Sequence, residues 1–248
     1  MSIAAAAGEH AGGFDSAGSQ LFAGLNPGQL ECARSCLRIH SQDFARGEEI
    51  LACQGGQPRY GVITSGVAFD VRRHANGERT LVDVIEPGDL LGDGWQPRTW
   101  HEANPSHERA AVGALPGQVL LIDPARLADE RVSCPARFAV QNNLLRAVLA
   151  KEERLRAKLE ILRFRGLRSR LGHYLLGEGR RRGGNRFTVP LNRSELAEYL
   201  HADRAAVSRE LARMQEEGLI SYHRNSFALG VGLSETALEP GCGERPSA

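Results

Sequence analysis

The sequence predicts an α+β protein with an N-terminal β jelly-roll barrel, a long helix and a C-terminal winged helix-turn-helix. Three observations carry this prediction. Short strand patterns separated by glycine-containing turns fill the first half of the chain, one long helical pattern follows, and two short helical patterns then precede a β-hairpin pattern. Many short strands at turn-length spacing are typical of a jelly roll or barrel. Helix, helix and hairpin in this order are typical of a winged helix.

Residues 1–19 are mostly small and predict a disordered N-terminus. They lack the positive flank and the long apolar centre of a signal peptide. No apolar run in the chain approaches the length of a membrane span. We therefore expect a cytoplasmic protein with no membrane partner. After residue 20, Leu25, Asn26 and Pro27 predict the start of a helix.

Residues 20–135 form the first predicted domain. Its strand patterns are 44–51 (strand, turn, strand), 60–63, 67–72, 79–85, 110–114 and 119–122. Glycines stand between these strands, as tight turns with positive φ require, and Asn76 with Gly77 predicts one such turn. By themselves the glycines indicate a fold and no particular ligand.

Residues 136–165 form the second predicted part, a single long helix. Apolar residues repeat at alternating intervals of three and four between Leu145 and Leu162, which is a heptad pattern, and Glu152 interrupts it. The pattern predicts a two-chain coiled coil and therefore a homodimer. A helix packed on its own barrel is the alternative. The candidate interface residues are Leu145, Val148, Glu152, Leu155, Leu159 and Leu162.

Residues 166–233 form the third predicted domain. Asn192 predicts a capped helix start, and the Glu three residues later completes a capping-box arrangement. After a short break, Asp203 can cap a second helix. Apolar residues from Val207 to Met214 give that helix a buried face. Gly218 ends it, and residues 234–248 are a predicted flexible tail.

Two short helices with arginines near the start of the second are what a helix-turn-helix DNA reader needs, because that helix enters the major groove. Arg can bind guanine through O6 and N7, and the start of the first helix can hold phosphate with the help of free N–H groups. The hairpin at 219–229 predicts a wing that meets phosphate. An ordinary helical hairpin with solvated arginines is the alternative. The candidate DNA-binding residues are Arg193, Ser194, Arg204, Ala205, Ser208, Arg209 and Arg224.

The distribution of charge agrees with DNA binding, although the net charge of +1 indicates no partner. Residues 151–230 contain 17 Lys and Arg against 10 Asp and Glu, a balance of +7. Residues 1–150 contain 13 against 17, a balance of −4. The basic charge therefore lies in the half that carries the predicted reader, as phosphate binding requires.

The segment LNRSELAEYLHADRAAVSRELARMQEEGLI resembles the DNA-binding module of the cAMP receptor protein / fumarate-nitrate-reduction regulator (CRP/FNR) family, through ELAEYL, VSREL and EEGLI at these separations. The resemblance implies a homodimeric transcription regulator that binds a palindromic site in double-stranded DNA. The family's base-reading positions are here Arg204, Ala205, Ser208 and Arg209. Ala205 replaces the Glu common in the family and can offer only a methyl contact to thymine. His201 replaces a Gly common in the turn.

The first half resembles the family's sensor barrel and is similar to a cyclic-nucleotide-binding domain, through FARGEEI, YGVITSG and NGERTLVDVIEPGDLLGD. The resemblance implies an effector pocket, and its candidate residues are Gly92, Asp93, Arg109 and Ala110. Asp93 is shorter than the Glu that takes the ribose hydroxyl in the family's nucleotide binders, and Gly94 breaks the helix expected to start there. We therefore expect a small-molecule effector other than cAMP, whose identity is unknown.

The five cysteines are Cys32, Cys36, Cys53, Cys134 and Cys242. In the cytosol they should be reduced. Cys32 and Cys36 are one helical turn apart and could lie side by side. Some members of the resembled family hold an iron–sulfur cluster, but a cluster needs four ligands at short characteristic spacings, which this chain lacks. Structural or incidental thiols are the expected role, with a redox switch as the alternative.

Other function classes find less support in these residues. Haem binding is an alternative, with His101 and His107 as candidate ligands, because a gas-sensing branch of the resembled family uses haem. The chain has no G-x-x-x-x-G-K-[ST] loop, no H-E-x-x-H and no G-x-S-x-G, so we do not expect an enzyme. A DNA-binding protein that responds to no effector is a further alternative. An activator would also contact RNA polymerase, through loops that the sequence does not identify.

Overall fold

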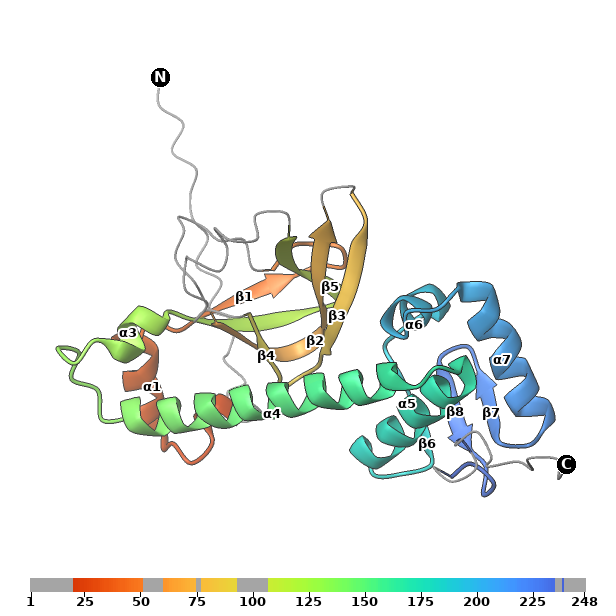
Figure 1. Ribbon diagram of the computed structural model, residues 1–248. Helices are drawn as coiled ribbons and strands as arrows, with labels where there is room; N and C mark the ends of the chain where they lie inside the picture. Colours follow the sequence, from red (N-terminus) through yellow and green to blue (C-terminus); the bar gives the residue numbers. More distant parts are fainter. Residues whose placement is uncertain (1–19, 51–59, 75–76, 93–106, 235–237, 239–248) are drawn as a thin grey trace, which may run out of the picture.

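The structure is a computed structural model that describes residues 20–50, 60–74, 77–92, 107–234 and 238. An N-terminal β domain, a long helix that runs past it, and a C-terminal domain at the far end of this helix make up the molecule (Figure 1). The antiparallel sheet, long helix and C-terminal helix-turn-helix confirm the predicted α+β class. In the part of the chain that the structure describes, every helix is too short or too polar to cross a membrane.

Two short helices precede the sheet. The 3-10 helix η2 spans Gln20–Phe22 and α1 spans Pro27–Cys36. The predicted start at Asn26 is confirmed: its side chain accepts a hydrogen bond from the Gln29 N–H, and the Gln29 side chain accepts one from the Asn26 N–H. This reciprocal cap determines where α1 begins. A further short helix, α3 (Pro124–Ala128), lies at the same end of the molecule (Figure 1).

The β domain is an antiparallel sheet with the strand order β1-β5-β2-β3, and β4 also pairs with β2. The strands are β1 (His40–Phe44), β2 (Tyr60–His74), β3 (Arg79–Ile85), β4 (Leu90–Leu91) and β5 (His107–Ile122). The β2–β5 pair runs from Tyr60 opposite Ile122 to His74 opposite His107. This long central pair carries the core of the domain.

The prediction of two short strands in place of each central strand was wrong. Breaks were predicted at 64–66 in β2 and at 115–118 in β5, but both strands continue through these positions with shifts in register. Gly66 has a φ of +77°, and a Cβ added there would lie 2.6 Å from the Gly117 Cα. The glycines thus permit a bulge where two backbones approach closely, and they do not turn the chain.

The long helix α4 is confirmed over Arg137–Arg163. The residues that it buries recur at intervals of three, four and seven, so they share one face: Val140, Asn143, Ala147, Lys151 and Lys158. Asn143 donates hydrogen bonds to the carbonyls of Leu21 and Ala23, at 2.9 and 3.0 Å. This face therefore lies on η2 and the β domain, and the opposite face is turned away from them.

The C-terminal domain combines helices with a small antiparallel sheet of order β6-β8-β7. Its elements are α5 (Leu167–Arg181), β6 (Arg186–Thr188), α6 (Arg193–Tyr199), α7 (Arg204–Glu216), β7 (Ile220–His223) and β8 (Ser226–Leu229). Val207, Leu211 and Met214 are fully buried, which confirms the predicted inner face of the second reader helix. Gly218, with φ of +72°, follows that helix as predicted.

Leu238 packs onto α5, although the sequence assigned it to a flexible tail. Its side chain is buried, and Ser169 Oγ donates a hydrogen bond of 2.7 Å to its carbonyl. A Cβ added at Gly172 would lie 2.3 Å from the Leu238 Cδ1. The packing of the C-terminal domain therefore extends beyond the predicted boundary at residue 233.

Candidate nucleic-acid interface

The start of α6 is a capped helix end. Asn192 Oδ1 accepts hydrogen bonds from the N–H groups of Ser194 and Glu195, at 2.9 and 3.0 Å. Glu195 in turn accepts one from the Asn192 N–H at 2.7 Å, so the predicted capping box is confirmed. These bonds occupy two of the amide groups that were expected to help hold phosphate. Ser194 is exposed and offers its hydroxyl instead.

The predicted base-reading residues lie on the outer face of α7. Asp203 caps the helix by accepting a hydrogen bond of 2.9 Å from a backbone N–H of the first turn. Arg204, Ala205 and Arg209 are exposed, and Ser208 is half-buried. The Ser208 hydroxyl donates a hydrogen bond of 3.0 Å to the Arg204 carbonyl. The arginines can thus reach a ligand directly, whereas Ser208 can accept a hydrogen bond but can donate one only after it releases its intrahelical bond.

Arg193 links the start of α6 to the wing. Its guanidinium donates a hydrogen bond of 3.1 Å to the Arg224 carbonyl and lies 5.1 Å from the centre of the Tyr222 ring. Arg224 has a φ of +55° in the two-residue turn of the β7–β8 hairpin. Arg193 therefore positions the wing, a structural contact that the sequence did not predict.

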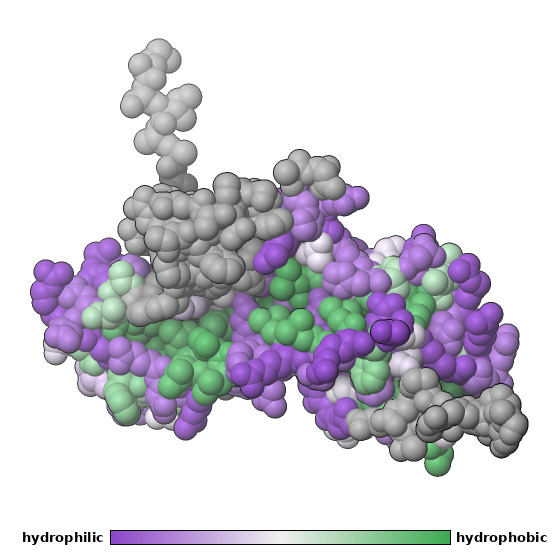
Figure 2. Space-filling view, viewed as in Figure 1, coloured by the Kyte–Doolittle hydropathy of each residue, from purple (hydrophilic) through white to green (hydrophobic). Residues whose placement is uncertain are grey.

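The outer face of α4 exposes large apolar side chains. They are Phe138 (80% exposed), Leu145 (56%), Val148 (38%), Leu149 (55%) and Leu159 (63%). Leu155 and Leu162 are half-buried, and Glu152 pairs with Arg156 at 2.6 Å. On the face shown in Figure 2, hydrophobic residues gather over the N-terminal half of the helix. Most of the predicted heptad stripe is thus exposed in the single chain, and Leu155 and Leu162 are covered in part.

The inner face of α4 carries cations that the sequence analysis missed. Lys151 donates a hydrogen bond of 2.9 Å to the Gly92 carbonyl and lies 3.5 Å from the Asp70 carboxylate. Lys158 donates to two backbone carbonyls of β3, at 2.7 and 2.8 Å. Burial lowers the pKa of Lys158 to about 8. The spacing of the basic residues at 151, 154 and 158 could have indicated this charged face, because residues three and four apart lie on one side of a helix.

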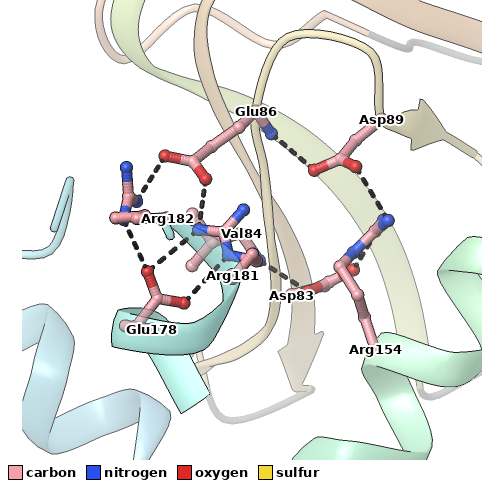
Figure 3. Close-up of polar contacts among 8 residues, drawn as sticks. All are labelled: Asp83, Val84, Glu86, Asp89, Arg154, Glu178, Arg181 and Arg182. Atoms are coloured by element: carbon pink, nitrogen blue, oxygen red, sulfur yellow. Dashed lines mark hydrogen bonds and ion pairs between the residues drawn. The ribbon is translucent and has the colours of Figure 1, made fainter. Parts of the chain in front are cut away.

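An ion-pair network joins the β domain to α5 (Figure 3). Glu86, between β3 and β4, pairs with Arg182 at 2.8 Å and also with Arg181. Glu178 on α5 pairs with the same two arginines, at 2.9 and 3.0 Å. Arg181 is the last residue of α5 and Arg182 follows it, so the end of this helix is held to the β domain through Glu86.

Arg154 of α4 contributes to the same junction (Figure 3). It lies 2.8 Å from the Asp89 carboxylate and 3.4 Å from that of Asp83. Burial raises the pKa of both carboxyl groups, and Arg154 opposes this rise. A cavity of about 140 Å³ lies beside them, lined by residues of the β domain, α4 and the C-terminal domain, including Tyr174 and Tyr199. The three parts of the molecule thus meet at one largely buried, charged site.

A groove of about 400 Å³ lies between the β domain and the start of α6. Arg46 and Leu115 line it from the β domain, and Arg193, Glu195 and Arg224 line it from the C-terminal domain. Two of the predicted phosphate-contacting residues therefore face the β domain, whereas Arg204, Ala205 and Arg209 of α7 are exposed to solvent.

The predicted effector pocket is described in part. Gly92 has a φ of +93°, and its carbonyl accepts the hydrogen bond from Lys151. Ala110 is 4% exposed and belongs to the hydrophobic core. Arg109 precedes it in β5, and His107 begins that strand. The backbone of β5 thus brings Ala110 into the core of the domain.

The predicted proximity of Cys32 and Cys36 is confirmed, since their Sγ atoms lie 3.4 Å apart. Cys134, 102 residues further along, lies 3.8 Å from Cys32. The sequence did not predict this third thiol, because only the tertiary fold brings it there. Four other candidates lie outside the described residues: Cys53, Asp93, His101 and Cys242.

Comparisons with known proteins agree with this geometry. The Crp-like helix-turn-helix domain matches residues 169–229. Among solved structures, FixK2 from Bradyrhizobium japonicum is 18% identical, covers 81% of this chain and 95% of its own, and has a TM-score of 0.62. A CRP-family transcriptional regulator from Thermus thermophilus is 24% identical, with 80% and 94% covered and a TM-score of 0.54. CLP, a c-di-GMP responsive global regulator from Xanthomonas campestris, is 13% identical, with 83% and 99% covered and a TM-score of 0.56. No curated protein sequence matches the chain.

The matched domain runs from α5 to the wing, and it contains α6, α7 and the β7–β8 hairpin. The solved structures share the fold over most of their own length. The helix-turn-helix and the fold that the sequence resemblance implied are therefore confirmed. The chain therefore carries a Crp-like helix-turn-helix domain within a fold that it shares with CRP/FNR-family transcriptional regulators.

Proposed function

We propose that the protein is a homodimer that binds a palindromic operator in double-stranded DNA, and that its N-terminal domain controls the geometry of the two helix-turn-helix units. The exposed face of α7 carries the proposal. Arg204 and Arg209 are exposed on this helix, outside its buried stripe, where each can bind a guanine edge through two hydrogen bonds. Exposed Ser194 and the wing residue Arg224 supply phosphate contacts, which set the register of the protein on the duplex.

The outer face of α4 supports the dimer. A second copy of α4 packed along the stripe from Leu145 to Leu162 would cover its apolar side chains, as in a two-stranded coiled coil. Glu152 is satisfied by Arg156 in its own chain, so it can stay at the solvent edge. The two-fold axis then places both α7 helices at one end of the dimer, suited to half-sites about one DNA turn apart.

The charged junction supports control by the N-terminal domain. An effector can change the geometry only if it binds one arrangement more tightly than another. In the described arrangement Arg193 and Arg224 face the β domain across a groove, so phosphate reaches them less easily. We assign this arrangement to the state of lower DNA affinity. Separation of Glu86 from Arg181 and Arg182 would free the C-terminal domain, with its helix-turn-helix, from the β domain.

We propose a small-molecule effector other than cAMP. Asp93 replaces the Glu that takes the ribose hydroxyl in the family's nucleotide binders, and Gly94 follows it. CLP, which has a similar fold, is described as c-di-GMP responsive, so this architecture serves effectors besides cAMP. The regulator acts in the cytoplasm, where its DNA partner is.

The stoichiometry of the DNA complex tests the proposal. Light scattering of the complex with a duplex selected from a random library should give two protomers for each duplex. Fluorescence anisotropy should give a much weaker affinity for a shuffled duplex of the same length. One protomer for each duplex, or equal affinity for both duplexes, would contradict the proposal.

A further inference from the structure

Three cysteines from two separate segments meet near the start of α4. Cys32 and Cys36 lie one turn apart on α1, and Cys134 lies in the segment that leads into α4. The Cys32 Sγ is 3.4 Å from the Cys36 Sγ and 3.8 Å from the Cys134 Sγ, and all three sulfurs lie within 4.8 Å of one another. The three side chains are half-buried, so a small ion can reach them from solvent.

We propose that Cys32, Cys36 and Cys134 bind one thiophilic d10 metal ion, such as Zn²⁺, through three thiolates. A Zn–S bond is about 2.3 Å long, and tetrahedral geometry then places neighbouring sulfurs roughly 3.8 Å apart. The distances of 3.4 and 3.8 Å from the central sulfur lie close to this value. Thiolates select soft ions, and three protein ligands leave a fourth position for water.

A disulfide explains the cluster less well. It requires a sulfur–sulfur distance of about 2.05 Å, and it would use only two of the three thiols. An iron–sulfur cluster usually has four protein ligands, most often four cysteines, whereas the described residues bring three cysteines together. The number of sulfurs and their spacing therefore favour a single ion.

The segment that carries Cys134 is held in place by other contacts. The Arg137 guanidinium donates hydrogen bonds to the carbonyls of Asp129 and Val132, and the Arg137 backbone N–H donates one of 3.1 Å to the Cys134 carbonyl. On the other side, α1 is fixed by its N-terminal cap and by fully buried Ala33. An ion would thus meet sulfurs whose backbones are already positioned, and a preorganised site binds more tightly.

A bound ion would cross-link α1 to the start of α4. Buried apolar residues already join the two helices there, among them Leu37, Ala136 and Val140. Because the ion should bind the folded chain, where the three sulfurs are close together, more tightly than the unfolded one, it should raise the melting temperature. The metal site itself does not depend on the proposed DNA binding.

The test uses the full-length protein, reduced, freed of metal with a chelator and titrated with Zn²⁺ alone. We expect one ion for each protomer, protection of three thiols from a thiol-reactive dye and a higher melting temperature. Cys134→Ser and Cys36→Ser should each weaken Zn²⁺ binding by at least about tenfold, because a thiolate that binds the ion directly is lost. Cys242→Ser is the matched control and should bind as the wild type does.

Equal Zn²⁺ binding by the wild type, Cys134→Ser and Cys36→Ser would overturn the proposal. So would stoichiometric iron with inorganic sulfide in protein purified without oxygen, because that result would mean a cluster in place of a single ion. Circular dichroism establishes that each variant folds. If Cys134→Ser does not fold, Cys36→Ser on α1 carries the test alone.

Discussion

Arg209 lies exposed on α7, opposite the buried stripe that anchors the helix. Arg209→Ala should cost roughly 1–3 kcal/mol of specific binding and relax the preference at one base pair, because a two-bond contact with guanine is lost. Anisotropy titrations with single-base operator variants measure both effects. Arg213→Ala is the matched control, since Arg213 is also exposed but lies near the end of the helix and pairs with Glu210 at 3.8 Å. Unchanged sequence specificity of the Arg209→Ala protein would show that Arg209 does not contact a base.

Ala205 is exposed on the same helix and has no hydrogen-bonding side chain. Ala205→Glu should shift the preferred half-site toward cytosine at the facing position, because a carboxylate accepts a hydrogen bond from the cytosine amino group. Selection from a random DNA library with each protein would detect the change. Recovery of the same motif with both proteins would refute the placement of Ala205 in the groove.

Lys158 gives the stability a pH dependence. Burial lowers its pKa from 10.5 to about 8, so between these values the unfolded chain binds more protons than the folded chain. The contribution of Lys158 to the free energy of unfolding should therefore rise from about pH 8 to pH 10.5. Lys158→Met should flatten this rise in denaturant-unfolding curves, whereas Arg156→Met on the exposed side of α4 should keep it. Identical slopes in the two variants would count against a buried, charged Lys158.

At the scale of elements, helix starts follow from local chemistry. Asn26, Asn192 and Asp203 cap their helices through groups at most three residues away, so the sequence suffices to predict them. The paths of β2 and β5 do not follow from local chemistry. Gly66 and Gly117 permit a close approach between strands that are distant in sequence. From the sequence alone, such glycines cannot be distinguished from glycines in turns.

The outer face of α4 yields a prediction at this scale. Leu159→Glu should convert the dimer to a monomer at micromolar concentration, because it places a charge in the apolar seam that the second helix would cover. Light scattering measures the mass directly. Val231→Glu is the control, since Val231 is fully exposed outside α4 and its replacement should leave the dimer intact. A Leu159→Glu protein that remains a dimer would exclude this face as the interface.

At the scale of the whole molecule, charges distant in sequence determine how the parts meet. The heptad pattern predicted the outer face of α4, but nothing near Lys151 or Arg154 in the sequence indicates that their partners are Asp70, Asp83 and Asp89 on the β domain. The helix-turn-helix could be predicted because one contiguous segment contains it. The interdomain junction could not, because three separate segments build it.

Glu86→Gln tests the role of this junction. Loss of the charge that pairs with Arg181 and Arg182 should release the C-terminal domain and raise operator affinity about fivefold, the lower end of typical coupling between sites. The Glu86 side chain is only 16% exposed, so this pair should matter more than a surface pair. Glu49→Gln is the matched control, because Glu49 pairs with Arg73 within the β domain at 2.8 Å. Unchanged or weaker operator binding by Glu86→Gln would contradict a restraining role.

The most direct test of a two-fold symmetric DNA reader is the DNA that the protein itself selects. The purified protein is incubated with a random double-stranded library, and the bound DNA is amplified and sequenced. We expect an inverted repeat whose half-sites are centred about one helical turn apart, and a loss of the repeat with Leu159→Glu. Enrichment of a motif without two-fold symmetry, or of no motif, would contradict a two-fold symmetric reader.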